Sequence, residues 1–590
     1  MSWSRPSARP LGAMTASVHI GQLSEEILLE VLSYLSISEL LIAARISQRF
    51  NRLCDEPQLW RRIYHSLFTV DRLKHPFSPA LDQRMRGSTE SRSFRTQLDR
   101  KGQRKQSQTE NDLHLGHTWK TLCRISLNWR RGSAGLTRIT PIIEQSETPS
   151  LTSQARSTTI LSPSQDPKNS TPNTIVRFHR SLLFVARKSK PPTESFPTVY
   201  VYNLQHDLNH QQQKTSVPVG TLLPDMGSYN APLLDGQGVT EISIDESCGE
   251  NSETARTAKS TVLVSVFYTT GQFTLYEINL SSVSSNAVEP MELDFRQVGL
   301  FEPSLPLKSS GQRKVLQGVV EIAKLHFPLL VTCSIDFHLS FFRLSWPSST
   351  AQPRRNLQIV KLPLDLQNHS CYWPLSLNLK RSEPLNERFK MTIAYPMPFY
   401  PAAWTVGLQE FDFEITSSRS MSSLQMNTNR FITAVQQPHD KDRRRMTGLS
   451  LNEAVIGIEQ AAGNVIVGRS DNTIDFFRLA ALADGSTDQR RRRLLCSKTL
   501  FGHTSRIGSI SVDENGRCVS GAQDGVKVWE GSQAVDVRPV ESLACVGETR
   551  RVSWIGSDSE KIVSLWISDH PDRHDHATIL DEEIRVLSFI

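Results

Sequence analysis

Three side chains that could form a hydrolytic triad occur close together near the end of the 590-residue sequence: His503, Ser520 and Asp524. In a triad, a histidine takes the proton of a serine nucleophile while a carboxylate orients the histidine. The surrounding residues suggest no oxyanion hole, which such chemistry also needs. All three lie in short β-type runs that end at Trp529, where a buried imidazole and carboxylate can satisfy each other. We therefore expect a structural hydrogen-bonded chain and no catalytic residue.

A second run of candidate ligands is the segment Asp569–His576, which is rich in aspartate and histidine. Metal ligands are usually held at a spacing that a helix or strand fixes, and nothing fixes it here. A polar loop between two β runs accounts for the composition. The sequence also lacks a phosphate-binding Gly-Lys loop and a His-Glu-x-x-His motif. We expect no metal and no cofactor, and we interpret the protein as non-enzymatic.

The composition indicates a globular protein with long polar stretches, since 38% of the residues are hydrophobic and 22% are charged. A chain of this length is expected to form two or more domains. The longest apolar run, Thr261–Tyr268, is far shorter than the ~20 residues that cross a bilayer. The segment Met1–Ala16 is polar, so we expect no secretory signal. None of the eight cysteines forms a C-x-x-C pair. A reducing compartment follows, the cytoplasm or the nucleus.

The formal net charge of +7 includes two short basic runs, Arg443–Arg445 and Arg490–Arg493. Both runs lie in polar segments, where a cluster of like charges is usually a solvated loop. A nuclear import signal is the alternative interpretation. We expect neither a nucleic-acid partner nor a membrane partner.

Apolar residues recur at helical spacing between residues 20 and 68. The pattern predicts three short amphipathic helices, the first over Leu23–Leu35, the second beginning at Ser38 and the third near Asp55. Three short helices make a small core and leave apolar surface for a partner to cover. The alternatives are a partner-binding module and an ordinary three-helix bundle.

The residues of this segment resemble the F-box over its whole length. The matching stretches are Leu23-x-x-Glu-Ile-Leu, Ser38-Glu-Leu-Leu, Arg49-Phe-Asn-Arg-Leu and Leu59-Trp60. Ser24 stands where the family usually has proline, and serine can still begin the helix as a cap. By this resemblance the module binds a Skp1-type adaptor and, through it, a cullin. The resemblance implies these adaptor-facing residues: Leu23, Ile27, Leu28, Leu32, Leu35 and Leu40.

The segments around the F-box are expected to be polar and flexible, apart from one helix. Residues 1–19 and the insert 69–117 cannot bury enough apolar surface to offset their ordering entropy. A linker helix is predicted over residues 118–132, and Gly132 offers its stop. Its tail, Asn128-Trp-Arg-Arg-Gly, resembles the element that joins F-box to propeller in F-box/WD-repeat proteins. The Ser/Thr/Pro-rich stretch 133–172 is predicted to be a second flexible linker.

Beyond residue 172 the hydrophobic period changes from helical to alternating, and the clearest unit is Phe501–Glu530. Two β runs flank a turn at residues 513–516, and another run follows Asp524-Gly525. The unit resembles a WD40 repeat, with Gly502-His503 near its start and Trp529-Glu530 in place of Trp-Asp. The link after Asp524-Gly525 is one residue shorter than usual. The resemblance implies a structural tetrad: His503, Ser520, Asp524 and Trp529.

Six weaker pairs of β runs resemble degenerate copies of this unit. They cover residues 182–204, 262–278, 330–344, 391–413, 465–479 and 562–589. Seven pairs predict a seven-bladed propeller over residues 173–590, closed by pairing of the last strand with one near residue 175. A two-sheet sandwich would not explain the Gly-His and Trp-Glu pairs. The predicted fold class is multidomain α+β: a three-helix F-box and a linker helix, then an all-β WD40-like propeller of about seven blades.

Together these features resemble the F-box/WD-repeat family, the substrate receptors of SCF-type cullin-RING ubiquitin ligases. In that role the F-box holds the adaptor and the propeller captures a protein substrate, phosphorylated or not, for ubiquitination. The chain would supply proximity, which raises the effective concentration of substrate lysines near the conjugating enzyme. We expect the substrate-binding residues to be Thr504, Ser505 and Arg506. The alternative is an F-box/propeller interaction scaffold outside any ligase.

Overall fold

A computed structural model describes the following residues: 20, 23–69, 118–139, 173–179, 181–188, 197–204, 218–224, 238–247, 261–280, 293–302, 319–334, 337–347, 356–364, 366–367, 376–382, 387–399, 403–417, 422–435, 455–461, 464–481, 492–513, 517–530, 533–539, 550–568 and 582–590. It contains two compact units, Met1–Leu127 and Asn128–Ile590. The predicted disordered residues 1–19, almost all of the insert 69–117 and the candidate metal loop 569–576 lie outside the described residues.

The first unit is a small bundle of short helices. Its helices are α1 Glu25–Leu32, α2 Ile37–Ala43, α3 Gln48–Cys54, α4 Pro57–Tyr64 and a π-helical turn, η2 His65–Thr69. The predicted second helix is therefore two helices, which corrects the three-helix expectation. Ser47 causes the division, because its side chain caps a new helix by accepting from the backbone N–H of Phe50 at 3.2 Å.

The core of this bundle is built from one face of each helix. Leu28, Leu32 and Leu40 pack there with Trp60, whose indole N–H donates to the carbonyl of Cys54 at 2.6 Å. Helix α8, Trp119–Arg131, adds the side chain of Cys123 to the same cluster. Gly132, at φ +65°, ends α8 in the left-handed conformation that glycine tolerates best.

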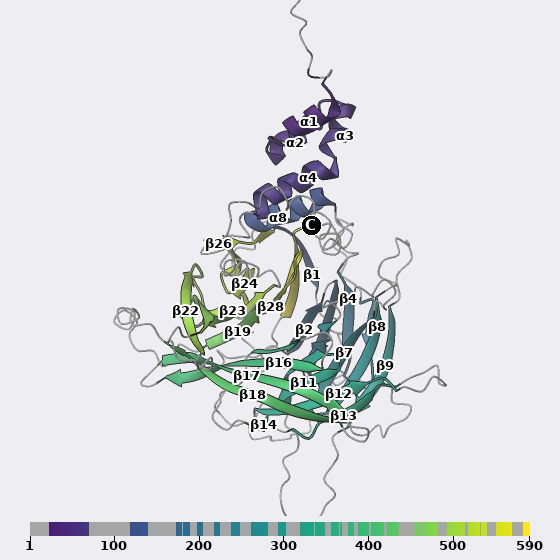
Figure 1. The fold of residues 1–590 in the computed structure, drawn as a ribbon, viewed down its shortest axis with the longest axis vertical. Coiled ribbons are helices and arrows are strands. Elements are labelled where there is room, and N and C mark those ends of the chain that lie inside the picture. Colours follow the sequence, from purple (N-terminus) through teal and green to yellow (C-terminus); the bar gives the residue numbers. More distant parts are fainter. Residues whose placement is uncertain are drawn as a thin grey trace, which may run out of the picture. The chain divides into compact units, whose positions relative to one another are not determined.

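The second unit is built from seven four-stranded blades in the described residues (Figure 1). Blade 1 contains β2 Thr174–His179, β3 Leu182–Arg187, β4 Val199–Asn203 and β5 Gly220–Leu222. Blade 2 contains β6 Val239–Ile244, β7 Thr261–Tyr268, β8 Phe273–Asn279 and β9 Asp294–Phe301. Blade 3 contains β10 Val320–His326, β11 Leu329–Ser334, β12 His338–Ser345 and β13 Gln358–Lys361, with β14 Leu366–Gln367 also beside β12.

The remaining blades continue in chain order. Blade 4 contains β15 Ser376–Arg381, β16 Arg388–Phe399, β17 Ala403–Ser417 and β18 Ser422–Val435. Blade 5 contains β19 Val455–Ala461, β20 Asn464–Arg469, β21 Thr473–Ala481 and β22 Arg492–Phe501. Blade 6 contains β23 Ile507–Val512, β24 Cys518–Ala522, β25 Gly525–Glu530 and β26 Gln533–Asp536. Blade 7 contains β28 Arg550–Ser557, β29 Lys561–Ser568, β30 Glu582–Ser588 and β1 Ser133–Ile139, with β27 Arg538–Pro539 beside β1.

The six weaker predicted β pairs each form the two central strands of one blade, and the unit Phe501–Glu530 contains the first three strands of blade 6, β23, β24 and β25. Central strands are buried on both faces because neighbouring blades cover them, so almost every residue of β3 and β11 is buried. This burial explains why alternation is weak in the degenerate copies, as expected for sheets covered on both sides. The propeller and its blade count follow from the sequence pattern.

The closure of the propeller differs from the prediction. The last strand, β30, pairs antiparallel with β1 rather than with the strand near residue 175, which is β2 of blade 1. Figure 1 shows β1 among the yellow strands from the end of the chain. Residues 133–139 are therefore the outer strand of blade 7, which corrects their assignment to a flexible linker. A pairing that joins residues more than 400 positions apart leaves no local signal in the sequence.

Blades 4 and 5 are joined into one eight-stranded sheet. The end of β18 pairs in parallel with β22, at Ala434 with Leu494 and at Val435 with Leu495. The strands of blade 4 are long enough to reach this contact, since β17 has 15 residues and β18 has 14. Blade 4 thereby supports the outer edge of blade 5.

Candidate functional site

The first candidate surface lies on the N-terminal bundle. Seven large apolar side chains between residues 20 and 46 are exposed there: Ile20, Ile27, Val31, Tyr34, Leu41, Ile42 and Ile46. We call this set the apolar face. Such a concentration of exposed apolar side chains in a small module indicates a protein-binding surface.

The local sequence explains how one helix supplies both core and surface. In α1, Leu28 and Leu32 are one turn apart and point into the bundle, whereas Ile27 and Val31 are one turn apart on the neighbouring side. The apolar stripe of this helix is thus wider than the core needs. Its inner half stabilises the bundle, and its outer half remains available to a partner.

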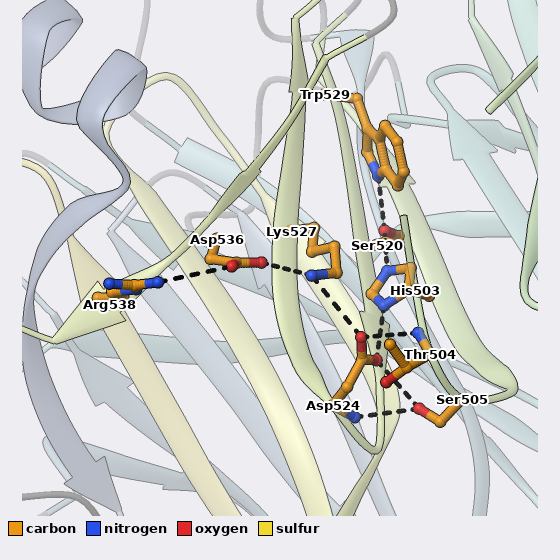
Figure 2. Close-up of polar contacts among 9 residues, drawn as sticks. All are labelled: His503, Thr504, Ser505, Ser520, Asp524, Lys527, Trp529, Asp536 and Arg538. Carbon is orange, nitrogen blue, oxygen red and sulfur yellow. Dashed lines mark hydrogen bonds and ion pairs between the residues drawn. The ribbon is translucent and has the colours of Figure 1, made fainter. Parts of the chain in front are cut away.

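The second candidate site is the hydrogen-bonded chain in blade 6 (Figure 2). Nδ1 of His503 lies 2.7 Å from the carboxylate of Asp524, and Nε2 lies 2.6 Å from the hydroxyl of Ser520. That hydroxyl accepts the indole N–H of Trp529 at 2.7 Å. The four predicted tetrad residues therefore form one continuous chain from the end of blade 6 to its core.

The donors in this chain fix the protonation of the histidine. Because the oxygen of Ser520 accepts from an indole, its own hydrogen is directed to Nε2 of His503, and Nδ1–H donates to Asp524. Burial lowers the pKa of His503, although the carboxylate acts against it. Burial would raise the pKa of Asp524, but hydrogen bonds from the backbone N–H of Thr504 and from His503 outweigh it and lower that pKa.

The distances among His503, Ser520 and Asp524 match those of a catalytic triad, but a substrate cannot reach the serine. Ser520 is 0% exposed, and its oxygen is occupied by the indole of Trp529. A nucleophile must reach a substrate carbonyl, and a fully buried hydroxyl cannot do so. The His/Ser/Asp set therefore ties the strands of blade 6 together.

The loop that precedes β23 holds the three predicted substrate-binding residues (Figure 2 shows Thr504 and Ser505). The backbone N–H of Thr504 donates to Asp524 at 3.0 Å, and its side chain is exposed. The hydroxyl of Ser505 donates to the carboxylate of Asp524 and accepts its backbone N–H, both at 3.0 Å. Arg506 is exposed. Thr504 and Arg506 are thus accessible, whereas Ser505 is engaged in the tetrad.

The short turn after Asp524 is made by glycine. Gly525 has φ +121°, a conformation that other residues adopt only with strain. A side chain there would meet nothing within 4 Å, so the backbone conformation and not space requires the glycine. The turn after Asp524 is one residue shorter than usual, and the left-handed conformation of Gly525 makes this short turn possible.

Comparisons with known families agree with this architecture. Residues 22–66 match the F-box-like family, and residues 250–552, more than half of the chain, match the family described as F-box protein pof12 beta-propeller. The chain belongs to the F-box protein pof12 beta-propeller family. This F-box protein therefore combines an F-box with a propeller interaction domain, and domains of both kinds typically act as non-catalytic interaction modules.

No curated protein sequence matches this F-box protein. Among solved structures, the Cps50 (Swd1) β-propeller domain of Myceliophteria thermophila is 11% identical, with 71% of this chain and 98% of that chain covered and a TM-score of 0.34. Sqt1 from Chaetomium thermophilum is 10% identical over 69% of this chain and 93% of its own, with a TM-score of 0.34. The Doa1 propeller is 13% identical over 69% and 89%, with a TM-score of 0.29. Likenesses this distant say nothing about function.

The structure places the six predicted adaptor-facing residues of the F-box in three environments. Leu28, Leu32 and Leu40 are 1%, 2% and 0% exposed, so they belong to the core of the module and not to its surface. Leu23 and Leu35 are half-buried against that core. Adaptor binding itself stays a prediction, but these three leucines cannot carry it directly.

Ile27, at 52% exposed, is the one predicted adaptor residue that the apolar face contains. The sequence interpretation missed its other members. Three consecutive apolar residues, Leu40, Leu41 and Ile42, were the available signal, because a helix cannot direct all three into one core. In the structure Leu40 is buried and the next two residues are exposed.

The last residues of α8 belong to the second unit, where Trp129 makes most of their contacts. Its ring is fully buried and stacks on Phe589 with centroids 3.8 Å apart, while the guanidinium of Arg517 lies 4.1 Å from its centroid. Its indole N–H donates to the carbonyl of Ser559 at 2.9 Å, and Asn128 donates to the carbonyl of Phe589. These contacts give the motif Asn128-Trp-Arg-Arg-Gly a structural role in the second unit.

The described residues contain no group of three or more His, Cys, Asp or Glu side chains that could hold a metal ion. The loop Asp569–His576 lies outside the part of the chain that the structure describes. No described helix is both long enough and apolar enough to cross a membrane.

Proposed function

We propose that this F-box protein is the substrate-recognition subunit of an SCF-type ubiquitin ligase. Its F-box would bind a Skp1-type adaptor, which in turn binds a cullin, and its propeller would hold a protein for ubiquitination. The observation that carries this proposal is the apolar face of the F-box module, which presents aliphatic side chains to solvent beside a complete core.

The energetics of the apolar face support a stable partner. Burial of exposed apolar surface contributes roughly 25 cal/mol per Å², and aliphatic side chains such as Ile27, Leu41 and Ile42 each contribute about 1–2 kcal/mol when a partner covers them. Several such contacts together are enough for a specific complex. The proposal places the protein in the cytoplasm or the nucleus, and five free cysteines among the described residues support a reducing compartment.

The test is affinity purification of the intact chain beside variants of the apolar face. Ile27→Asp/Ile42→Asp changes two exposed residues, so the bundle should keep its fold while losing its partner. Leu67→Asp is the matched control, because Leu67 is exposed in the same module but lies in η2. Circular dichroism checks that all variants are folded, and blots detect adaptor and cullin.

We expect the wild type and the control to recover adaptor and cullin together, and the double variant to recover neither. Recovery of adaptor without a cullin would favour the interaction scaffold over the ligase subunit. Recovery of neither by the wild type would refute the proposal. A Leu28→Asp variant is unsuitable here, because it places a charge in the core and unfolds the module.

A further inference from the structure

Two neighbouring inner strands of the propeller, β23 of blade 6 and β28 of blade 7, run side by side in the same direction. The backbone N–H of Ile555 donates to the hydroxyl of Ser509 at 3.1 Å. Two residues further along both strands, the N–H of Ser557 donates to Ser511 at 3.1 Å. Because the strands advance in step, the residues that precede them lie at the same end of the propeller.

Arginines occupy that end of both strands. Arg506 directly precedes β23, and Arg550 and Arg551 begin β28. The register of the two strands, with Ser509 beside Ile555 and Ser511 beside Ser557, places Arg506 level with Val552 and next to Arg551. Partial burial of its guanidinium lowers the pKa of Arg506, and the positive charge of Arg551 lowers that pKa further, in agreement with this placement. Thr504, whose side chain is exposed, lies in the same loop as Arg506.

Strands β30 and β1 of blade 7 add two more arginines at this end. Glu583, which is buried, forms ion pairs with Arg550 at 2.5 Å, Arg585 at 2.7 Å and Arg138 at 3.3 Å. Three guanidinium groups from β28, β30 and β1 thus share one carboxylate. Arg585 also lies over the ring of Trp566, 4.4 Å from its centroid, which holds its side chain in place.

The basic surface continues onto blade 1. Glu582 accepts the backbone N–H of Asn173 at 2.6 Å, and the carbonyl of Asn173 accepts the N–H of Lys188 at 2.7 Å. Arg187 precedes Lys188 at the end of β3, opposite the start of β2. We call the combined set the basic end: Arg138, Arg187, Lys188, Arg506, Arg550, Arg551 and Arg585. Among the described carboxylates near these arginines, Asp524, Glu582 and Glu583 are each held by bonds within the propeller, and Asp536 pairs with Lys527.

We propose that the basic end binds an extended, acidic segment of a partner protein, with aspartate and glutamate side chains seated against its arginines. This inference rests on the proposed function, since it names the class of substrate that the propeller would hold. The arginine and lysine side chains of the basic end are spread over blades 6, 7 and 1. This spread matches a ligand with several carboxylates along an extended chain better than a ligand with one compact anionic group. Phe501 is the last residue of β22 and is 66% exposed, so it offers an apolar anchor just before the loop that leads to Arg506.

The chain itself shows the chemistry that the proposal requires. At Glu583 a carboxylate is already recognised by guanidinium groups from separate strands. Arginine suits carboxylates because its planar fork donates two parallel hydrogen bonds. A partner segment with similar carboxylates would repeat this arrangement at Arg506 and Arg551.

The test measures binding of a fluorescein-labelled peptide of alternating glutamate and glycine to the intact protein by fluorescence anisotropy. Three probes of matched length serve as comparisons: a glutamine–glycine peptide, a peptide with a single phosphoserine, and single-stranded DNA. The variant is Arg506→Gln/Arg551→Gln. The control, Arg430→Gln/Arg478→Gln, removes the same charge from blades 4 and 5. Circular dichroism and thermal unfolding establish that both variants are folded.

We expect the acidic peptide to bind, the glutamine peptide not to bind, and the Arg506/Arg551 variant to bind at least 10-fold more weakly than the control. Affinity should fall as salt is raised from 50 to 200 mM, because exposed charges are screened. Equal affinity in both variants would overturn the proposal, as would tighter binding of the phosphoserine peptide or of DNA.

The same protein preparations are also assayed for recovery of adaptor and cullin, which separates the two proposals. If the acidic peptide binds but no adaptor is recovered, the basic end is an acidic-segment site and the ligase proposal fails. If adaptor and cullin are recovered but the peptide does not bind, the ligase proposal stands and this inference fails.

Discussion

Replacing Ser520 by alanine removes the one oxygen that joins His503 to Trp529. In the wild type this hydroxyl donates to Nε2 of the histidine at 2.6 Å and accepts from the indole at 2.7 Å. Alanine is smaller by a single oxygen and fits the same strand. The substitution therefore tests the hydrogen-bonded chain with little change in packing.

The expected cost follows from the two partners that remain. A buried polar group left without its hydrogen bond costs about 1–3 kcal/mol. Ser520 is fully buried, so water does not easily replace its oxygen. Two unsatisfied partners predict a loss of about 3 kcal/mol in the local stability of blade 6, which corresponds to roughly 100-fold more frequent opening, since each 1.4 kcal/mol is a factor of ten.

The assay is native-state hydrogen exchange of the intact chain, because a domain of this size is not expected to unfold in one step. Peptides that cover β24 and β25 should exchange ~100-fold faster in Ser520→Ala, while peptides from blade 1 should be unchanged. Ser505→Ala is the matched control. Its hydroxyl is half-exposed, so water can replace its bonds and the expected cost is below ~1 kcal/mol.

Exchange in blade 6 within threefold of the wild type would refute the structural role of the tetrad. A double-mutant cycle with Trp529→Phe provides an independent check. Phenylalanine has no indole N–H. In the Trp529→Phe background, Ser520→Ala therefore leaves only Nε2 of His503 without its hydrogen bond. The combined cost should therefore be smaller than the sum of the two single costs.

Substitutions at two further positions, Trp129 and Asp558, test the region around the linker helix. Trp129→Ala should lower the stability by about 3–5 kcal/mol, because it empties the fully buried ring position against Phe589. Trp129→Phe should lower it by only about 1 kcal/mol, for the lost hydrogen bond to the carbonyl of Ser559. Limited proteolysis within residues 119–139 compares the two variants, and equal cleavage would contradict this prediction. Burial raises the pKa of Asp558 to about 6, so its contribution to stability is present below its ordinary pKa and is lost as the pH rises through about 6. Asp558→Asn keeps the oxygen that accepts two backbone N–H groups, but it carries no charge to bury. The variant should therefore be more stable than the wild type by about 1–2 kcal/mol at pH 7.5 and not at pH 4. Parallel pH profiles of the melting temperature for the variant and the wild type would show the reasoning to be wrong.

Features that depend on short stretches of sequence were predictable. Each blade has its two central strands adjacent in the chain, so turn residues and β runs reveal it even where the repeat is degenerate. The tetrad was predictable for the same reason, since His503 and Trp529 both lie in one repeat. Its bonds in the structure connect residues of that repeat alone.

The division between core and surface in the F-box was not predictable from periodicity. A helical stripe shows that residues share one side, but it does not show where the module's own core ends. Leu28 and Ile27 are adjacent members of one stripe, yet one is buried and the other is exposed. Only the packing of the other helices on α1 separates them.

What the sequence by itself determined is therefore the set of local elements: a helical F-box module, a helix ended by Gly132, and seven β hairpins. The tertiary structure alone decided how distant segments meet. It placed β1 beside β30, joined blades 4 and 5, and brought arginines from separate strands to one end. The physical reason is that hydrogen bonds and apolar contacts within a hairpin or helix are set by near neighbours. Contacts between remote segments depend on chain closure and on the summed packing of the whole domain.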